Sequence, residues 1–389
     1  LKESIYTCKR CDGILEVYLN DLQDRLDKFK DWKRRPLSVW RYTPFLPDLT
    51  IEPVTLNEGG TLLLKSERLA EELKVKELYI KFEGQNPTGS FKDRGMTVGV
   101  SKAKELGHKM VICASTGNTS SSLAAYAAKG DLLCIVIVPA RKVALGKLAQ
   151  AIIYGAKIIM LEGSFDQALK IVLELCSKYK DIYLLNSVNP YRLEGQKTAA
   201  FEICEQLGDN PDVVILPVGN AGNISAYWKG FKEFYEVGFI KNLPRMIGIQ
   251  ANGASPIVKA VKKGEREIER VLHPETIATA IRIGSPVNWR RALNSIYESK
   301  GYAESVSDDE IILAQKDLAK KEGLFVEPAS AASIAGLKKL LEEGLIDKDE
   351  RIVCVATGHG LKDPDIVLRD FKFEKVEANI KLVEKLLGL

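Results

Sequence analysis

Short apolar runs alternate with helical stretches from about residue 78 onward, and this alternation limits the possible folds more than any other feature of the sequence. Most of the runs are continuous, as expected for strands that are buried on both faces. Strands separated by helices build a mostly parallel sheet that helices cover. The sequence therefore predicts an α/β fold, with strands at residues 78–83, 110–113, 132–138, 157–161, 213–217, 246–250 and 351–356.

Four of the intervening helical stretches end at a glycine: Gly107, Gly130, Gly155 and Gly208. We expect each of these glycines to adopt the left-handed conformation that closes a helix, because glycine adopts it without a steric penalty. The loops that carry chemical side chains fall at residue 84 and near residue 190. We therefore predict a smaller domain at residues 84–190, inserted between the two parts of a larger one at residues 1–83 and 191–389.

The charge balance argues against a nucleic-acid-binding protein. Lys and Arg number 56 and Asp and Glu 52, so the net charge of +4 is not the concentrated positive field that such proteins carry. A membrane span needs roughly 18 consecutive apolar residues, and no run in the sequence approaches that length. The first residues lack the basic and apolar segments of a signal peptide. We expect a cytoplasmic protein that binds neither nucleic acid nor membrane.

A loop rich in Gly and Pro leads from the strand at 78–83 into a helix and places Lys92 near the helix N-terminus. A cation is disfavoured at the positive end of the helix dipole, which favours the neutral, nucleophilic form of the amine. Such an amine can form a Schiff base. An ordinary surface lysine in a strand-to-helix turn is the alternative, and it is the better interpretation of Lys92 taken alone.

A second polar loop follows a buried strand, opens a helix and contains Ser115, Thr116, Asn118 and Thr119. Open α/β sheets bind ligands at the carboxyl ends of their strands, where this loop lies. Asn118 can hydrogen-bond a phenolic oxygen, while the three hydroxyls suit a carboxylate or a phosphate. Helix capping by Ser and Thr is the alternative.

A third loop joins a strand to a helix and consists of Gly219, Asn220, Ala221, Gly222 and Asn223. The N–H groups and the dipole at such a helix start can bind a phosphate. The loop has neither the Gly-x-Gly-x-x-Gly spacing of a dinucleotide site nor the Gly-Lys-Ser/Thr ending of a nucleotide-binding loop. A small cofactor phosphate fits better than ATP or NAD, and a tight turn without a ligand is the alternative.

A fourth loop begins at Thr357, where the strand at 351–356 ends. The hydroxyl of Thr357 can pair with a ring nitrogen of a bound ligand. A neutral hydroxyl, unlike a carboxylate, need not keep a pyridine nitrogen protonated, so it would moderate electron withdrawal by the ring. His359 in the same loop is better interpreted as a satisfied loop histidine.

These four segments, in this order, resemble those of the threonine synthases. That family is one of the pyridoxal-phosphate (PLP) enzymes of fold type II, with the tryptophan synthase β-subunit and the serine and threonine dehydratases. The resemblance spans about residues 50–365 and is most specific at residues 86–94, 219–223 and 357–364. Dehydratases typically carry a glycine run in place of residues 219–223, and often a Ser or Cys in place of Thr357. These two segments therefore favour the threonine synthases.

The resemblance implies a two-domain α/β fold of PLP fold type II, in which mostly parallel sheets are covered by helices. It implies that Lys92 holds PLP as a Schiff base, that Phe91 lines the ring pocket and that Asn118 meets the ring hydroxyl. Residues 219–223 would hold the cofactor phosphate, and Thr357 would meet the pyridine nitrogen. A homodimer is the usual state of this family.

The resemblance also implies a reaction, in which O-phospho-L-homoserine and water become L-threonine and phosphate. Lys92 would remove the Cα proton and then a Cβ proton, phosphate would leave from Cγ, and water would add at Cβ. The substrate phosphate would be held at residues 185–195, which follow a strand-like run at 182–185: Arg192 supplies a bidentate fork, and Asn186 and Ser187 add neutral donors. Alternatively, the Asn-Pro pair in this segment merely starts a helix.

The pair Cys8 and Cys11 resembles half of the zinc ribbon at the start of some archaeal-type threonine synthases. A structural zinc needs four ligands, so we expect no bound metal. Two other functions stay open. One is a different enzyme on this scaffold, such as a threonine dehydratase or a cysteate synthase that uses phosphoserine. The other is an inactive relative that binds a phospho-ligand, against which Lys92 argues because a binding protein needs no Schiff-base amine.

Overall fold

The structure is a computed structural model that describes residues 4–11, 13–140, 145–163, 165–369 and 374–389. Its larger sheet has six strands in the order β1-β2-β10-β7-β8-β9. All neighbouring strands in this sheet pair in parallel, except that β1 runs antiparallel to β2. In chain order the strands are Leu63–Lys65 (β1), Glu77–Phe82 (β2), Val213–Pro217 (β7), Arg245–Ala251 (β8), Tyr302–Val306 (β9) and Arg351–Ala356 (β10).

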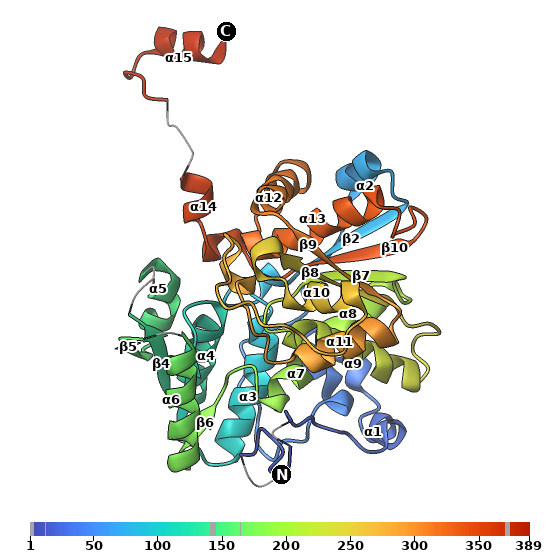
Figure 1. Cartoon of the computed structure of the whole chain (residues 1–389), viewed down its shortest axis with the longest axis vertical. Coiled ribbons are helices and arrows are strands. Elements are labelled where there is room, and N and C mark those ends of the chain that lie inside the picture. The colour runs from blue at the N-terminus through green and yellow to red at the C-terminus, as the bar shows by residue number, and fades with distance from the viewer. Residues whose placement is uncertain (1–3, 12, 141–144, 164, 370–373) are drawn as a thin grey trace.

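The second sheet has four parallel strands in the order β5-β4-β3-β6. These strands are Met110–Ala114 (β3), Leu133–Pro139 (β4), Lys157–Leu161 (β5) and Ile182–Leu184 (β6). In Figure 1 this sheet lies at the left, apart from the larger one. The fold-class prediction is confirmed.

Helices cover both faces of each sheet, and the side chains along a strand alternate between the two layers. Val214 and Leu216 of β7 pack in one apolar cluster with α8, α9, α10 and α11, while Val213 and Ile215 pack in another with α2, α12 and α13. In the smaller sheet, α3, α4 and α5 lie on one face and α6 on the other.

These covering helices span Glu67–Leu73 (α2), Lys92–Glu105 (α3), Asn118–Gly130 (α4), Leu145–Ile153 (α5), Phe165–Lys178 (α6), Thr198–Leu207 (α8), Gly222–Glu236 (α9), Pro256–Lys263 (α10), Trp289–Glu298 (α11), Asp308–Glu322 (α12) and Pro328–Glu342 (α13). The other α-helices are Leu22–Lys28 (α1), Pro190–Gln196 (α7), Asp365–Leu368 (α14) and Ile380–Leu387 (α15). Short 3₁₀ helices lie at Trp32–Arg34, Val39–Phe45, Glu83–Gln85, Asn252–Ala254, Thr279–Ile281 and Gly360–Lys362.

All seven predicted strands are present: β5, β7 and β10 have the predicted bounds, and the other four differ by one residue at one end or at both. The strand-like run at 182–185 is β6, which ends one residue earlier. The prediction did not include β1 and β9. Strand β1 has three residues, too few to show a pattern. Strand β9 contains the fully buried Glu304, whose charge interrupts the apolar pattern and is offset by Lys262 and Lys339.

The predicted helix ends are confirmed at three of the four glycines, with φ of 80° at Gly107, 80° at Gly155 and 72° at Gly208. The prediction for Gly130 is wrong, because Gly130 is the last residue of α4 and Asp131 adopts the left-handed conformation instead, with φ of 57°. A Cβ at Gly130 would lie 3.3 Å from methyl groups of Val54 and Val100. This glycine therefore serves close packing.

No helix in the described parts of the chain combines the length and the apolar character that a membrane span needs.

Candidate active site

A cavity of about 860 Å³ lies where the carboxyl ends of strands from both sheets meet their following loops. Every residue predicted for the site lines it: Phe91, Lys92, Ser115, Thr116, Asn118, Thr119, Asn186, Ser187, Arg192, Gly219, Asn220, Ala221, Gly222, Asn223 and Thr357. The structure thus brings five separate segments to one place.

Lys92 is the first residue of α3, and its Nζ lies 3.9 Å from the centroid of the Phe91 ring. Burial, together with the positive charge of Arg192, lowers the pKa of Lys92 to about 7, while the carboxylate of Glu327 acts in the opposite direction. A substantial fraction of the amine is therefore neutral near pH 7. This is the form that attacks a carbonyl carbon.

The two residues after Lys92 fix the start of α3. The carboxylate of Asp93 accepts hydrogen bonds from the backbone N–H and hydroxyl of Thr88, at 2.7 and 2.6 Å, and from Ser122 at 2.6 Å. These contacts tie the loop before Lys92 to α3 and α4.

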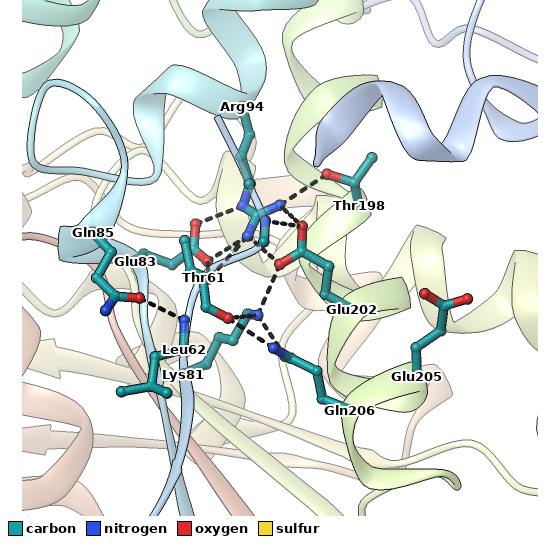
Figure 2. A network of polar contacts seen from close by, with 12 residues as sticks. Thr61, Leu62, Lys81, Glu83, Gln85, Arg94, Thr198, Glu202, Glu205 and Gln206 are labelled. Carbon is teal, nitrogen blue, oxygen red and sulfur yellow. Dashed lines mark hydrogen bonds and ion pairs between the residues drawn. The ribbon is translucent and has the colours of Figure 1, made fainter. Parts of the chain in front are cut away.

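Arg94 extends from the same turn into a buried ionic cluster, which Figure 2 shows. Its guanidinium donates to both carboxylate oxygens of Glu83 at 2.6 and 2.8 Å, and to both of Glu202 at 2.7 Å. Lys81 donates to Glu202 at 2.8 Å, so two cations and two carboxylates balance. These four side chains, which we call the Arg94 cluster, are fully buried and join α3 to β2 and α8.

Arg192 reaches the cavity because α3 and α7 cross at unusually close range. A Cβ at Gly195 would lie 1.7 Å from the carbonyl oxygen of Arg94, and a Cβ at Gly95 would lie 2.8 Å from that of Arg192. Only glycine fits at these two contacts. Helix α7 begins with Asn189 as its N-cap and Pro190 as its first residue, so the Asn-Pro pair does start a helix, as the alternative interpretation held.

Arg192 is 2% exposed, and its guanidinium makes one long described contact, from one terminal nitrogen to the carbonyl oxygen of Leu185 at 3.4 Å. Its Nε has no hydrogen-bond partner among the described residues. Burial lowers the pKa of Arg192 to about 10, which still leaves it charged at neutral pH. A buried cation with unused donors beside Lys92 is suited to bind an anion.

Asn186 and Ser187 are held by the protein itself. The Asn186 side chain accepts from the backbone N–H of Ala114 and donates to its carbonyl oxygen, both at 3.0 Å. The carbonyl oxygen of Ser187 accepts from the side-chain amide of Asn288 at 3.0 Å, and Ser187 lines the cavity. Asn186 therefore ties β3 to the end of β6 and retains one amide hydrogen for a ligand.

The loop at residues 219–223 has the geometry of a phosphate cradle. A Cβ at Gly219 would lie 2.9 Å from the carbonyl oxygen of Ala280, and Ala221 has φ of 65° immediately before α9. The first N–H groups of a helix have no partner within the helix. Both polar side-chain atoms of Asn223 and the Oε1 of Gln196 are buried without a described hydrogen-bond partner. These unsatisfied groups fit a phosphate-bearing cofactor, which would provide partners for the donors among them.

Sequence reasoning missed Glu327, a buried carboxylate in the cavity wall. It accepts from Nδ2 of Asn118 at 3.0 and 3.1 Å, and burial raises its pKa. Glu327 is the N-cap residue of α13 and Pro328 is the first residue of that helix. A proline at the start of a helix and a carboxylate beside the apolar pair 325–326 were the available signals.

Thr357 follows β10, and its carbonyl oxygen accepts from the backbone N–H of Phe91 at 3.0 Å. This bond places the Thr357 loop directly beside Lys92. The ring of His359 accepts from the backbone N–H of Leu361 at 3.1 Å, so His359 is engaged within its own loop, as interpreted from the sequence.

The long connection between α10 and α11 was also missed. Residues from it line the cavity, including Arg270, His273 and Arg282. Irregular connections of this length are usually functional or disordered. The length of this segment was the one sequence signal available, since it contains no motif.

Cys8 and Cys11 lie near the N-terminus, far along the chain from the cavity residues. Across the described ranges, no three His, Cys, Asp or Glu side chains gather in a way that could hold a metal ion.

Comparison with known proteins agrees with this geometry. A family model described as "Pyridoxal-phosphate dependent enzyme" matches residues 54–358. The chain is 60% identical to the threonine synthase of Methanocaldococcus jannaschii, over 99% of this chain and 96% of that one. It is 57% identical to the threonine synthase of Methanosarcina acetivorans, over 98% and 94%. The solved structure of processed threonine deaminase isoform 2 from Solanum lycopersicum superposes with a TM-score of 0.68 at 23% identity, covering 90% of this chain and 94% of that one, and so supports the fold alone.

The chain belongs to the pyridoxal-phosphate dependent enzymes, with the architecture of fold type II. Within them it belongs to the threonine synthase family. The predictions of a PLP-dependent lyase and of PLP as the cofactor are thereby confirmed.

Proposed function

We propose that the chain converts O-phospho-L-homoserine and water into L-threonine and inorganic phosphate. The observation that carries this proposal is the presence of two separate anion sites in one cavity. The loop at 219–223 suits one phosphate, and Arg192, beside the amine of Lys92, suits another. A cofactor phosphate and a substrate phosphate would fill them.

We assign the cofactor contacts to residues already on the cavity wall. Lys92 would attach the cofactor covalently, residues 219–223 would hold its phosphate, and Phe91 would line the ring. Asn118 would face the ring hydroxyl and Thr357 the ring nitrogen. When bound, pyridoxal phosphate supplies an electron sink for the charge left on carbon after a proton is removed.

Lys92 is the proposed base and acid of the reaction. Its Nζ would take the Cα proton and then a Cβ proton of the substrate, because a pKa of about 7 lets it both accept and return protons near neutral pH. The C–O bond at Cγ then breaks and phosphate leaves. Water adds its hydroxyl at Cβ and gives its other proton to the departed phosphate. Lys92 would carry the two substrate protons one at a time, so that one returns to Cγ and one to Cα.

Arg192 is the proposed anchor of the substrate phosphate. Its unused donors lie beside Lys92, as the shift that its charge imposes on the pKa of Lys92 indicates. Ser115, Thr116, Thr119, Asn186 and Ser187 would add neutral donors. A cation here also stabilises the departing phosphate, so it would contribute to both binding and bond cleavage.

We further propose that residues 84–190 act as a mobile domain that closes over the substrate and excludes water. A cytoplasmic location and a homodimer are part of the same proposal, and the resemblance to the threonine synthases implies the dimer. Sedimentation of the purified protein would test the dimer.

The deciding experiment is to supply the PLP-loaded protein with O-phospho-L-homoserine and to measure phosphate and amino-acid products. Equal amounts of phosphate and L-threonine are expected, and none of either with Lys92→Ala. Release of 2-oxobutanoate in place of L-threonine, or consumption of sulfite with phosphoserine, would identify a different enzyme. Borohydride reduction should attach the cofactor to the peptide that contains Lys92.

A further inference from the structure

Ser330, in the first turn of α13, lies directly behind Thr357. The hydroxyl oxygens of the two residues are 3.0 Å apart, and Ser330 is fully buried. Thr357 and Ala329 are among the residues that line the cavity, and Ser330 is not among those described as doing so. Ser330 can therefore reach a bound ligand only through Thr357.

The Ser330 hydroxyl has two further contacts, both with Gly358. It accepts from the backbone N–H of Gly358 at 2.7 Å, and it lies 3.1 Å from the carbonyl oxygen of Gly358. That carbonyl oxygen already accepts from the backbone N–H of Glu327 at 3.1 Å.

A hydroxyl carries one hydrogen, so Ser330 can donate to Thr357 or to the carbonyl of Gly358, but not fully to both. If it donates to Thr357, the hydrogen of Thr357 is released and points into the cavity. If it donates to Gly358, the hydrogen bond between the two hydroxyls needs Thr357 as its donor, and Thr357 then presents only lone pairs to the cavity. The direction of this one hydrogen bond decides whether Thr357 acts as a donor or as an acceptor.

We propose that Ser330 is a positioning residue that donates to Thr357 and thereby aims the Thr357 hydrogen at the pyridine nitrogen of the cofactor. The inference rests on the proposed function, which places the ring nitrogen against Thr357. An unprotonated pyridine nitrogen is an acceptor and needs a donor. The nearby carboxylate of Glu327 contacts Asn118, so it is not the partner of Thr357. The chain from Gly358 N–H through Ser330 to Thr357 also polarises each bond in turn.

The test compares Ser330→Ala, Thr357→Val and the double variant, each loaded with pyridoxal phosphate labelled with ¹⁵N in the ring. Thr357→Val should move the ¹⁵N signal to that of a pyridine nitrogen without a hydrogen bond, and weaken cofactor binding about 3- to 10-fold. Ser330→Ala should shift the signal in the same direction by a smaller amount. In the Thr357→Val background, Ser330→Ala should change neither the signal nor the affinity further.

Ser333→Ala is the matched control. Ser333 lies three residues further along α13, is 1% exposed and donates to the carbonyl oxygen of Ser330, without contacting Thr357. It should leave the ¹⁵N signal unchanged. If Ser330→Ala lowers the yield of folded protein, Ser330→Cys keeps the volume with a weaker donor and should give a smaller shift in the same direction.

Two outcomes would overturn the inference. One is an unchanged ring signal in Ser330→Ala while Thr357→Val moves it. The other is an equal effect of Ser330→Ala with and without Thr357, which would show that Ser330 only supports the fold through Gly358. An unchanged signal in Thr357→Val would instead remove the proposed placement of the ring, and with it the basis of the inference.

Discussion

The carboxylate of Glu327 accepts hydrogen bonds from the side-chain amide of Asn118, at 3.0 and 3.1 Å from Nδ2. This pairing fixes which end of the Asn118 amide faces the carboxylate, and so leaves Oδ1 for another partner. It also keeps a buried negative charge close enough to Lys92 to raise the pKa of that lysine. Glu327 thus orients the amide of Asn118 and shifts the pKa of Lys92, two side chains that we propose contact the cofactor.

Removal of that charge should lower the pKa of Lys92. In Glu327→Gln the Lys92 amine would remain neutral to a lower pH, because the charge of the Glu327 carboxylate raises the pKa of Lys92. We expect the pH midpoint for attachment of PLP to the cofactor-free protein to move down. The measurement is the rate of the absorbance change on PLP addition across a pH series. Glu342→Gln, at the exposed end of the same helix, should leave the midpoint in place.

Removal of Arg192 should have the opposite effect on Lys92. The Arg192 charge lowers the pKa of Lys92, so Arg192→Ala should raise the midpoint for PLP attachment, and Arg192→Lys should move it less. Arg192→Ala should also reduce kcat/KM for O-phospho-L-homoserine by at least about 30-fold, because a buried charged contact to phosphate is lost. Normal turnover in Arg192→Ala with PLP still bound would remove Arg192 from the substrate site and leave the phosphate to the loop at 115–119.

The loops of the site could be predicted because each obeys a local rule. The sequence shows the same local pattern at four loops, in which a strand ends, a polar or glycine-rich turn follows and a new helix begins. These are the loops of Lys92, Asn118, residues 219–223 and Thr357. Parallel strands of one sheet point the same way, so the loops after β2, β7 and β10 gather at one edge of the larger sheet, where the loop after β3 of the smaller sheet meets them. That relation required no knowledge of side-chain packing.

The contacts that tune the site could not be predicted, because they join residues that are distant in sequence. Glu327 meets Asn118 across 209 positions, and Arg94 meets Glu202 across 108. The close crossing of α3 and α7 depends on the absent side chains of Gly95 and Gly195, which in sequence look like ordinary helix glycines. Only tertiary packing shows why they are glycines.

Thr357→Asp should retain the cofactor but change the products. A carboxylate facing the ring nitrogen would keep that nitrogen protonated, which strengthens the electron sink. More of the substrate would then be converted into elimination products in place of L-threonine. We expect a smaller share of L-threonine and a larger share of elimination products, measured by chromatography of a single reaction mixture. An unchanged product ratio would mean that residue 357 does not face the ring nitrogen.

The Arg94 cluster should carry a large share of the stability of the fold around Lys92. In Glu202→Gln, one of the two balancing carboxylates is lost while Arg94 and Lys81 remain buried and charged. The loss of one partner from a buried pair costs about 3–5 kcal/mol. Chemical denaturation should show this decrease in the free energy of unfolding. Glu350→Gln is the control, because its partner Arg245 is 31% exposed and such a pair is worth at most about 1 kcal/mol.

The same cluster predicts how stability depends on pH. Arg94 and Lys81 hold the pKa of Glu202 at about 2 against a desolvation effect that would raise it, compared with an ordinary value of 4.5. Because the folded-state pKa lies below the unfolded one, the contribution of Glu202 is complete above pH 4.5 and is lost as pH falls towards 2. The free energy of unfolding should therefore fall steeply with acid in the wild-type chain and less steeply in Glu202→Gln, which has no carboxylate to protonate at this position. Equal acid slopes in the two proteins would show that Glu202 does not titrate with folding, and that the cluster is not the acid-sensitive support of the helix that carries Lys92.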